Sequence, residues 1–321
     1  MWTFHPILKT TIWGGEKIAK YAGISTSLHN IGEDWILSDV EGSESVVDEG
    51  PDQGKKLSQL MRHYGPELLG DCNYKRFGHH FPLLIKIIDA AQDLSVQVHP
   101  DDELARKRGY SNGKTEMWYV IGADKDARLA NGFLKPVDPS KYEELVESGE
   151  IVDVMNFNTI HPGEAYFIPA GRVHAIGKGA FVAEIQQTSD VTYRLYDYHR
   201  KDKDGKEREL HTALAFDAIN FNDTDGKAVE FTPIDNFPVQ MVDSPYFTTD
   251  LLKLSGKTTR DYSELDSFVV LIGIEGTASV KSGNQTVELT PGRAVLLAST
   301  ETKITLTPKG NVTMLETYIK S

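Results

Sequence analysis

The most informative segment of this chain reads Pro162-Gly163-Glu164-Ala165-Tyr166-Phe167-Ile168-Pro169-Ala170-Gly171-Arg172-Val173-His174. Its apolar centre predicts a strand. The Pro-x-Gly that follows predicts a tight corner, because glycine reverses the backbone readily and proline cannot serve in a central ladder. His174 then stands at the start of the next strand. We expect a hairpin corner that holds His174 rigidly, as a metal ligand must be held.

Polar side chains occupy one face of an alternating strand upstream of this corner. Because residues two apart point to one face of a strand, Ser95, Gln97 and His99 lie together. Glu116 precedes another apolar strand. With His174, these residues offer two imidazoles, a carboxylate and an amide oxygen, which suit zinc and also manganese, iron or cobalt. Structural zinc sites usually use cysteines and the chain has one, so we expect an open, catalytic site.

The spacing Gly-x5-Pro-x-Gly-x2-His is similar to the second motif of the cupin superfamily, small β-barrels that usually carry a metal. The chain resembles one family more closely, the type I mannose-6-phosphate isomerases (phosphomannose isomerases) in their short bacterial form. The segments that carry this resemblance follow the family order: Ile12-Trp13-Gly14-Gly15, Gly32-Glu33-Asp34-Trp35-Ile36-Leu37-Ser38, Gln97-Val98-His99-Pro100, Gly113-Lys114-Thr115-Glu116-Met117-Trp118-Tyr119, Pro169-Ala170-Gly171-Arg172-Val173-His174-Ala175 and Arg194-Leu195-Tyr196-Asp197-Tyr198. Gln97 departs from the general cupin pattern, which has histidine there, but glutamine is a feature of the isomerase family.

The resemblance implies a fold that is mainly β, with two cupin-type (jelly-roll) β-barrels and a few inserted helices. We expect a catalytic metal-binding domain with helical insertions at residues 1–235. A cupin-like domain without a metal site is expected at residues 236–321. A weak internal repeat places Lys303 where His174 stands, and no histidine follows His211. The second barrel is therefore expected to supply no imidazole.

Composition indicates a soluble enzyme of a reducing compartment. The chain of 321 residues is 40% hydrophobic, enough for a full core, and its single cysteine excludes an internal disulfide framework. No stretch approaches the ~20 apolar residues of a membrane span. No secretory pattern is visible at the N-terminus. We expect a cytoplasmic protein with no membrane partner, and the sequence does not indicate its oligomeric state.

The charge of the chain limits its partners. A net charge of -13 argues against nucleic acid. The same charge would repel a phosphorylated substrate, so local cations must attract it. Lys86 lies within a run of branched aliphatic residues, where an unpaired ammonium is costly. A cation that faces an anionic ligand explains that placement. Lys114 stands two residues before Glu116, and Arg194 matches the arginine that the isomerase family treats as catalytic.

The resemblance implies interconversion of mannose 6-phosphate and fructose 6-phosphate through an enediol(ate), with a hexose 6-phosphate as substrate. One divalent metal per chain, expected to be zinc, would be held by Gln97, His99, Glu116 and His174. Arg194 would stabilise the charge that develops on the sugar oxygens. Lys86, Lys114 and Ser95 would position the substrate and its phosphate.

Several points remain open at this stage. The proton-transfer base could be Glu184, Lys114 or a water on the metal. The sequence does not say which cation binds the phosphate. A different metal-cupin enzyme, such as an iron dioxygenase, and a non-catalytic sugar-binding cupin are the alternatives. The cations Lys86, Lys114 and Arg194 argue against a dioxygenase, because an apolar substrate would not need them.

Overall fold

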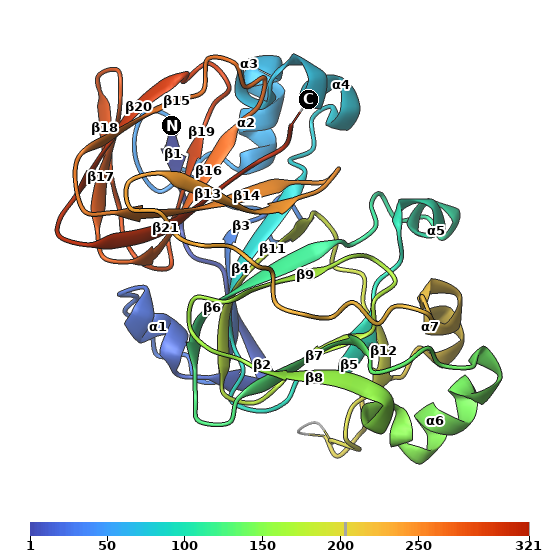
Figure 1. Ribbon diagram of the computed structural model, residues 1–321. Coiled ribbons are helices and arrows are strands. Elements are labelled where there is room, and N and C mark those ends of the chain that lie inside the picture. The colour runs from blue at the N-terminus through green and yellow to red at the C-terminus, as the bar shows by residue number, and fades with distance from the viewer. Residues whose placement is uncertain (202–203, 321) are drawn as a thin grey trace.

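The computed structural model describes residues 1–201 and 204–320. These residues form a mainly β protein with four sheets and a few short helices (Figure 1). The sheets come in two pairs, one from each half of the chain. The expected fold class, mainly β with inserted helices, is confirmed. None of the described helices is both long and apolar enough to cross a membrane.

The first pair of sheets contains the segments that the sequence marks as chemically important. A six-stranded sheet has the order β2-β3-β4-β11-β6-β9, with β2 (Leu8–Gly15), β3 (Ile31–Leu37), β4 (Leu83–Asp89), β6 (Glu116–Ala123), β9 (Ala165–Ile168) and β11 (Ala180–Gln187). A five-stranded sheet has the order β12-β5-β10-β7-β8, with β5 (Val96–Val98), β7 (Arg128–Phe133), β8 (Met155–Thr159), β10 (His174–Ile176) and β12 (Tyr193–Tyr196). Apolar residues from both sheets, such as Trp118 and Ile176, form one buried cluster, so the sheets face each other.

The second pair of sheets repeats this arrangement with an apolar interior. Its six-stranded sheet has the order β1-β19-β16-β21-β14-β13, with β1 (Trp2–Thr3), β13 (Pro238–Asp243), β14 (Thr248–Leu254), β16 (Val269–Glu275), β19 (Ala294–Leu297) and β21 (Val312–Tyr318). Its four-stranded sheet has the order β15-β20-β17-β18, with β15 (Thr258–Asp261), β17 (Ala278–Ser282), β18 (Gln285–Leu289) and β20 (Lys303–Pro308). Because β1 pairs with β19, the first residues of the chain complete a sheet of the second half.

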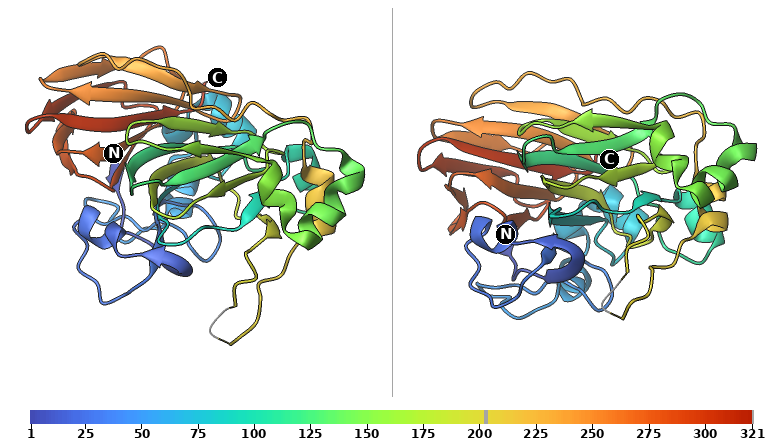
Figure 2. Two further views of the ribbon diagram at one scale, coloured as in Figure 1. Left: turned by 60° about the horizontal axis from the view of Figure 1, so that its bottom comes forward. Right: turned by 90° about the horizontal axis from the view of Figure 1, so that it is seen from below.

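Six of the α-helices form two sets, and α1 lies apart from both (Figure 1). One set includes α2 (Leu57–Tyr64), α3 (Pro66–Leu69) and α4 (Asp71–Phe77), and the other includes α5 (Asp102–Lys107), α6 (Tyr142–Ser148) and α7 (Thr212–Ala218). A short helix α1 (Lys17–Tyr21) and two 3-10 turns, η1 (Pro139–Lys141) and η2 (Glu150–Val154), complete the set in the described residues. The α2 and α3 side chains join a core shared by both six-stranded sheets, which ties the halves together. Figure 2 shows the orange-to-red second half lying against the green strands of the first.

The corner before His174 differs from the expected hairpin. Strand β9 pairs with β6, whereas β10 pairs with β5 and β7 in the other sheet. The Pro-x-Gly turn therefore carries the chain from one sheet to the other. Gly171 has φ +87°, and a Cβ there would lie 3.0 Å from the Ala218 carbonyl oxygen. Its N–H donates to the His99 carbonyl at 2.9 Å, so the corner fixes His174 beside His99.

The sequence register that aligns Lys303 with His174 is wrong by one residue, because the Lys303 side chain points away from the interior of the second half. The Lys303 side chain is 68% exposed and pairs with Asp261 at 3.2 Å. Its neighbour Ile304 is 1% exposed and lies in the apolar cluster between the two sheets of the second half. Because side chains alternate along a strand, a shift of one residue exchanges the inner and outer faces. The inward position that His174 holds in the first half is an isoleucine in the second.

The second half buries one group of charged residues. Glu316 is fully buried and accepts hydrogen bonds from Arg260, at 2.6 and 3.0 Å, and from Tyr262 at 2.8 Å. Asp250 pairs with Glu316 across β14 and β21 and accepts from the Tyr318 hydroxyl at 3.1 Å. Burial, and then the charge of Glu316, raise the pKa of Asp250 to about 6. Arg260 balances one of the two carboxylates, so Asp250 is the costly one at neutral pH.

We expect Asp250→Asn to stabilise the protein at neutral pH. A carboxyl whose folded pKa is raised contributes stability that is fully present below its unfolded pKa, near 3.8, and is lost as pH rises through about 6. Because the amide does not ionise, it should raise the free energy of unfolding by at most ~3 kcal/mol at pH 7.5 and by about 1.5 kcal/mol at pH 5. Urea unfolding at both pH values measures the difference. The exposed Asp225→Asn is the control, and a gain that is equal at both pH values would contradict the assignment.

Candidate metal centre

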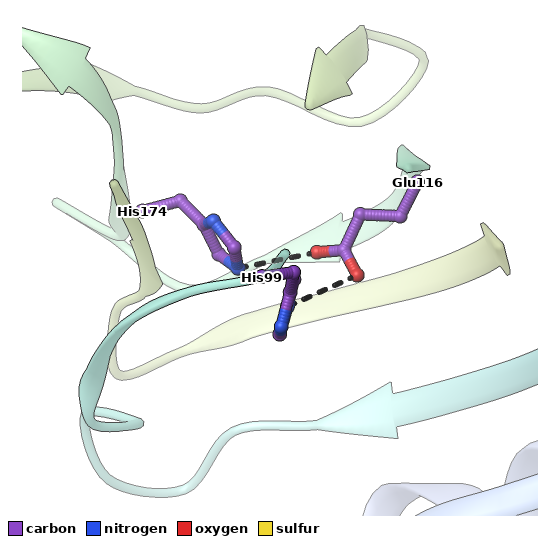
Figure 3. A group of neighbouring side chains, drawn as sticks. All are labelled: His99, Glu116 and His174. Carbon is purple, nitrogen blue, oxygen red and sulfur yellow. Dashed lines mark ion pairs between the residues drawn. The ribbon is translucent and has the colours of Figure 1, made fainter. Parts of the chain in front are cut away.

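Three buried side chains converge between the two sheets of the first half. His99 follows β5, His174 opens β10 in the same sheet, and Glu116 opens β6 in the facing sheet. The His99 Nε2 lies 3.5 Å from Glu116 Oε2, and the His174 Nε2 lies 3.3 Å from Glu116 Oε1 (Figure 3). One ligand atom from each residue lies within 4.8 Å of the others. The geometry therefore forms a group that could hold a metal ion.

Both imidazoles are oriented by backbone carbonyls. The Nδ1 of His99 lies 2.9 Å from the Val191 carbonyl oxygen, and the Nδ1 of His174 lies 2.9 Å from that of Arg172. Because a carbonyl only accepts, each Nδ1 carries the hydrogen and each Nε2 presents a lone pair. Burial lowers the pKa of His99 well below its usual value and that of His174 to about 3. Neutral imidazoles with free Nε2 atoms are the form that binds metals.

The unpaired atoms of the cluster fit a bound cation. Both carboxylate oxygens of Glu116 and the Nε2 of His174 are buried without a hydrogen-bond partner in the described structure. Burial, and then the charge of Glu184, raise the pKa of Glu116. The Lys114 ammonium lies near Glu116 Oε2 and the His99 Nε2, but the His174 Nε2 and Glu116 Oε1 have no donor in the described residues. Buried acceptors without a donor cost free energy, and a divalent cation among them would remove that cost. The donor set has no thiolate, which suits zinc as well as other divalent metals.

A cavity of about 380 Å³ adjoins this cluster. Five of the residues predicted from the sequence line it: Lys86, Ser95, Gln97, Lys114 and Arg194. Gln97 of β5 pairs with His174 of β10, so the two side chains leave the same face of the sheet. The structure thus brings Gln97 beside the three clustered residues.

The two lysines of the cavity are paired with carboxylates. Lys86 lies 3.1 Å from Glu184 and 3.8 Å from Glu33. Lys114 lies 3.1 Å from Glu116 and 3.2 Å from the Nε2 of His99. Lys114 therefore connects the cavity to the histidine cluster, and Lys86 connects the cavity to Glu184.

Glu184 lies under the cavity in the strand register of Lys86 and Trp118. The Trp118 indole donates to it at 2.9 Å. Although burial alone would raise the pKa of Glu184, the charges of Lys86 and Lys114 hold it below its usual value. Glu184 is thus a buried, ionised carboxylate at the cavity, as a candidate base must be.

Arg194 lies on β12 in register with Gln97 of β5. Its Nη1 donates to the Glu209 carbonyl at 2.8 Å, and its Nε is buried without a partner in the described residues. Sequence reasoning missed three further charged residues of the cavity, Glu33, Asp190 and Arg208. Arg208 lies beyond the last recognisable motif, and only the folding of its loop onto β12 reveals its place.

A cupin-type pair of sheets with a buried His-Glu-His cluster beside a polar cavity defines a candidate metal-cupin protein. Residues 1–162 match the family model "Phosphomannose isomerase type I, catalytic domain", and residues 238–318 match "Mannose-6-phosphate isomerase, cupin domain". The chain belongs to the type I mannose-6-phosphate isomerase family, and it is an enzyme of that class. The family resemblance read from the sequence motifs is confirmed.

Individual relatives agree with this assignment. The chain is 36% identical over 297 residues to mannose-6-phosphate isomerase ManA of Bacillus subtilis. The alignment covers 92% of this chain and 91% of the relative. It is 32% identical to a mannose-6-phosphate isomerase of Streptococcus mutans, with 90% of this chain and 89% of the relative covered. The crystal structure of a mannose 6-phosphate isomerase from Bacillus subtilis superimposes with a TM-score of 0.89 at 31% identity, over 99% of each chain.

Proposed function

We propose that this chain is a metal-dependent aldose–ketose isomerase that interconverts mannose 6-phosphate and fructose 6-phosphate through an enediol(ate). The observation that carries the proposal is the convergence of His99, Glu116 and His174 beside a cavity lined by cations, with the His174 Nε2 and both Glu116 oxygens lacking a hydrogen-bond partner in the described residues. A phosphorylated sugar needs cations in its binding site, whereas an apolar dioxygenase substrate would gain nothing from them. Relatives over nearly the full chain carry the name mannose-6-phosphate isomerase.

One zinc ion per chain is proposed, held by His99, Glu116 and His174 with the amide oxygen of Gln97. When bound, the metal would polarise the sugar oxygens and stabilise negative charge on them. The Nδ1 hydrogen bonds of the two histidines keep their Nε2 lone pairs directed at the cluster. Lys114, which contacts Glu116 and His99, would hold a substrate oxygen at the edge of this cluster.

The carboxylate of Glu184 is proposed to move the proton between C1 and C2. It lines the cavity, and its Oε1 makes no hydrogen bond in the described residues although Lys86 lies 3.1 Å away. Lys114 is the weaker candidate for the base, because its ammonium is engaged with Glu116 and would have to lose its proton first. Trp118 fixes the other oxygen of Glu184, so the oxygen beside Lys86 is the one that would accept the substrate proton.

The remaining residues are proposed to bind and orient the sugar. Arg194 would stabilise the negative charge of the enediolate, and Lys86, Lys114 and Ser95 would position the substrate. All of these residues lie within residues 1–235, which we propose as the catalytic domain. Residues 236–321 would form a cupin-like domain without a metal site, since the inward position equivalent to His174 is Ile304.

The direct test is a coupled assay with mannose 6-phosphate and purified, zinc-loaded protein. We expect conversion to fructose 6-phosphate and the reverse reaction from fructose 6-phosphate. Exchange of the C2 proton with solvent deuterium, followed by mass spectrometry, would support the enediol(ate) route. Loss of metal without loss of turnover would contradict the role of the metal. A protein that binds the sugar phosphate but never converts it would contradict catalysis.

A further inference from the structure

The positive charge of the cavity is not distributed evenly. Lys86 has Glu184 and Glu33 as partners, and Lys114 has Glu116. These ammonium groups therefore carry little unbalanced charge toward a ligand. Any excess of positive charge must lie elsewhere along the cavity wall, where an anion would bind most favourably.

The excess positive charge lies where Arg194 and Arg208 line the cavity, which we call its arginine end. In the described part of the chain, Arg194 forms no ion pair with a carboxylate, and its Nε has no partner. Burial, and then the neighbouring charge of Arg208, lower the pKa of Arg194. Arg208 lines the same cavity. Two guanidinium groups held near each other in a partly buried wall repel, and a bound anion between or beside them would relieve that repulsion.

One carboxylate holds two arginines at this end. Asp197, 5% exposed, accepts from the Nε and Nη2 of Arg208, each at 2.6 Å, and also pairs with Arg200. Arg200 in turn donates to the Asp93 carbonyl at 2.5 Å. Among the described residues, Arg208 donates two of its five N–H groups, both to Asp197, which leaves three that could reach a ligand. With one acid for two guanidinium groups, the Asp197 cluster keeps a net positive charge.

The backbone next to Asp197 is strained. Tyr198 and His199 have φ of 55° and 51°, a region that side-chain-bearing residues seldom adopt in succession. The Arg200 N–H donates to the Asp197 carbonyl at 3.0 Å, which closes this turn. The turn brings Arg200 back onto the Asp197 carboxylate. Backbone strain costs free energy, and here it accompanies a charged cluster at a cavity. This cost points to a role for the cluster in that cavity.

The strand register sets the distance between the two ends of the cavity. His174, Gln97 and Arg194 follow one another across β10, β5 and β12. Two strand spacings separate the backbones of His174 and Arg194, roughly 10 Å. A hexose whose C1–C2 end lies at the His174 cluster would therefore extend its phosphate past Arg194, toward Arg208.

We propose that Arg208 binds the phosphate of the substrate, and that Asp197 is the positioning residue that holds Arg208 in the cavity wall. This inference rests on the proposed function for the identity of the sugar. The chemistry that it requires is only an anionic phosphoryl group, so inorganic phosphate serves as a probe that does not depend on turnover. On this proposal, Arg194 would lie between the phosphate subsite and the histidine cluster.

The test compares Arg208→Gln, Arg208→Lys and Asp197→Asn with the parent enzyme. Loss of charge-assisted hydrogen bonds to phosphate should raise the KM for mannose 6-phosphate about 10- to 100-fold in Arg208→Gln, with a much smaller change in kcat. The inhibition constant of inorganic phosphate, and its dissociation constant by calorimetry, should rise by a similar factor. Arg208→Lys should recover part of the loss, since it keeps the charge but not the planar fork.

Asp197→Asn should shift KM in the same direction but less, because Arg208 keeps its charge. Adding Asp197→Asn to Arg208→Gln should then cause little further change if Asp197 acts through Arg208. The exposed Arg106→Gln is the matched control and should leave KM and phosphate binding unchanged.

The results separate this inference from the proposed function. An inactive parent enzyme would refute the proposed function, and calorimetry with inorganic phosphate would still decide the role of Arg208. An active parent enzyme, with an Arg208→Gln variant that binds phosphate normally and keeps its KM, would overturn the inference alone. A fall in kcat with unchanged KM would likewise overturn it.

Discussion

Replacing His99 and His174 together with alanine should remove the bound metal and lower kcat by at least ~1000-fold. Of the proposed ligands, the variant would keep only Glu116 and the Gln97 amide, and Lys114, 3.1 Å away, would neutralise Glu116 instead. Elemental analysis of freshly purified protein should give about one zinc ion per chain in the parent enzyme and none in the variant. A chelator should inactivate the parent enzyme, and added zinc should restore it.

The matched control replaces two exposed histidines, His29 and His161, whose side chains are 80% and 69% exposed. It removes the same number of imidazoles from the chain without touching the cluster, so metal content and turnover should stay normal. Circular dichroism of both double variants would show that each is folded. Full metal content in the His99 and His174 variant would refute the proposed site.

Local sequence rules predicted several of the residues that gather at the site. Alternation along a strand placed Gln97 and His99 together, and the Pro-x-Gly corner placed His174 at the start of a strand. Both rules are local, because they depend on backbone geometry within a few residues. In the structure Gln97 is in register with His174, and both histidines lie within 3.5 Å of Glu116.

Contacts across sheets and loops could not be predicted in this way. Lys86 meets Glu184 because β4 and β11 are neighbours in the sheet. No local sequence pattern predicts which strands pair. The corner before His174 carries the chain from one sheet to the other. The same turn motif could equally join two neighbouring strands of one sheet, so the sequence does not distinguish the two. Lys303 was misaligned because a weak repeat leaves the register uncertain by one residue, and one residue reverses the face.

The arginine cluster shows the same limit. Asp197 belongs to a recognisable motif, but Arg208 lies eleven residues further on, and nothing in the sequence links the two. The strained turn at Tyr198 and His199, which returns Arg200 to Asp197, is likewise not predicted by local propensity. Residues held by strain are those that sequence patterns are least able to find.

Replacing Arg194 with alanine should lower kcat by ~100-fold or more while changing KM for mannose 6-phosphate much less. Charge on an enediolate exists only along the reaction path, so a residue that stabilises it contributes little to binding of the ground state. The position of Arg194 fits this role, because it pairs with Gln97 in the strand register and its Nε is buried without a partner in the described residues. Steady-state kinetics in both directions measure the two parameters.

Two further variants sharpen this prediction. Arg194→Lys keeps the charge but loses the planar fork, so it should recover activity only in part. Arg208→Gln should show the opposite pattern, a raised KM with kcat nearly kept, because a phosphate is anionic in both ground and transition states. The two neighbouring guanidinium groups thus serve as controls for each other. If Arg194→Ala kept its kcat and raised only KM, Arg194 would belong to the phosphate subsite, and the charge on the enediolate would need another partner.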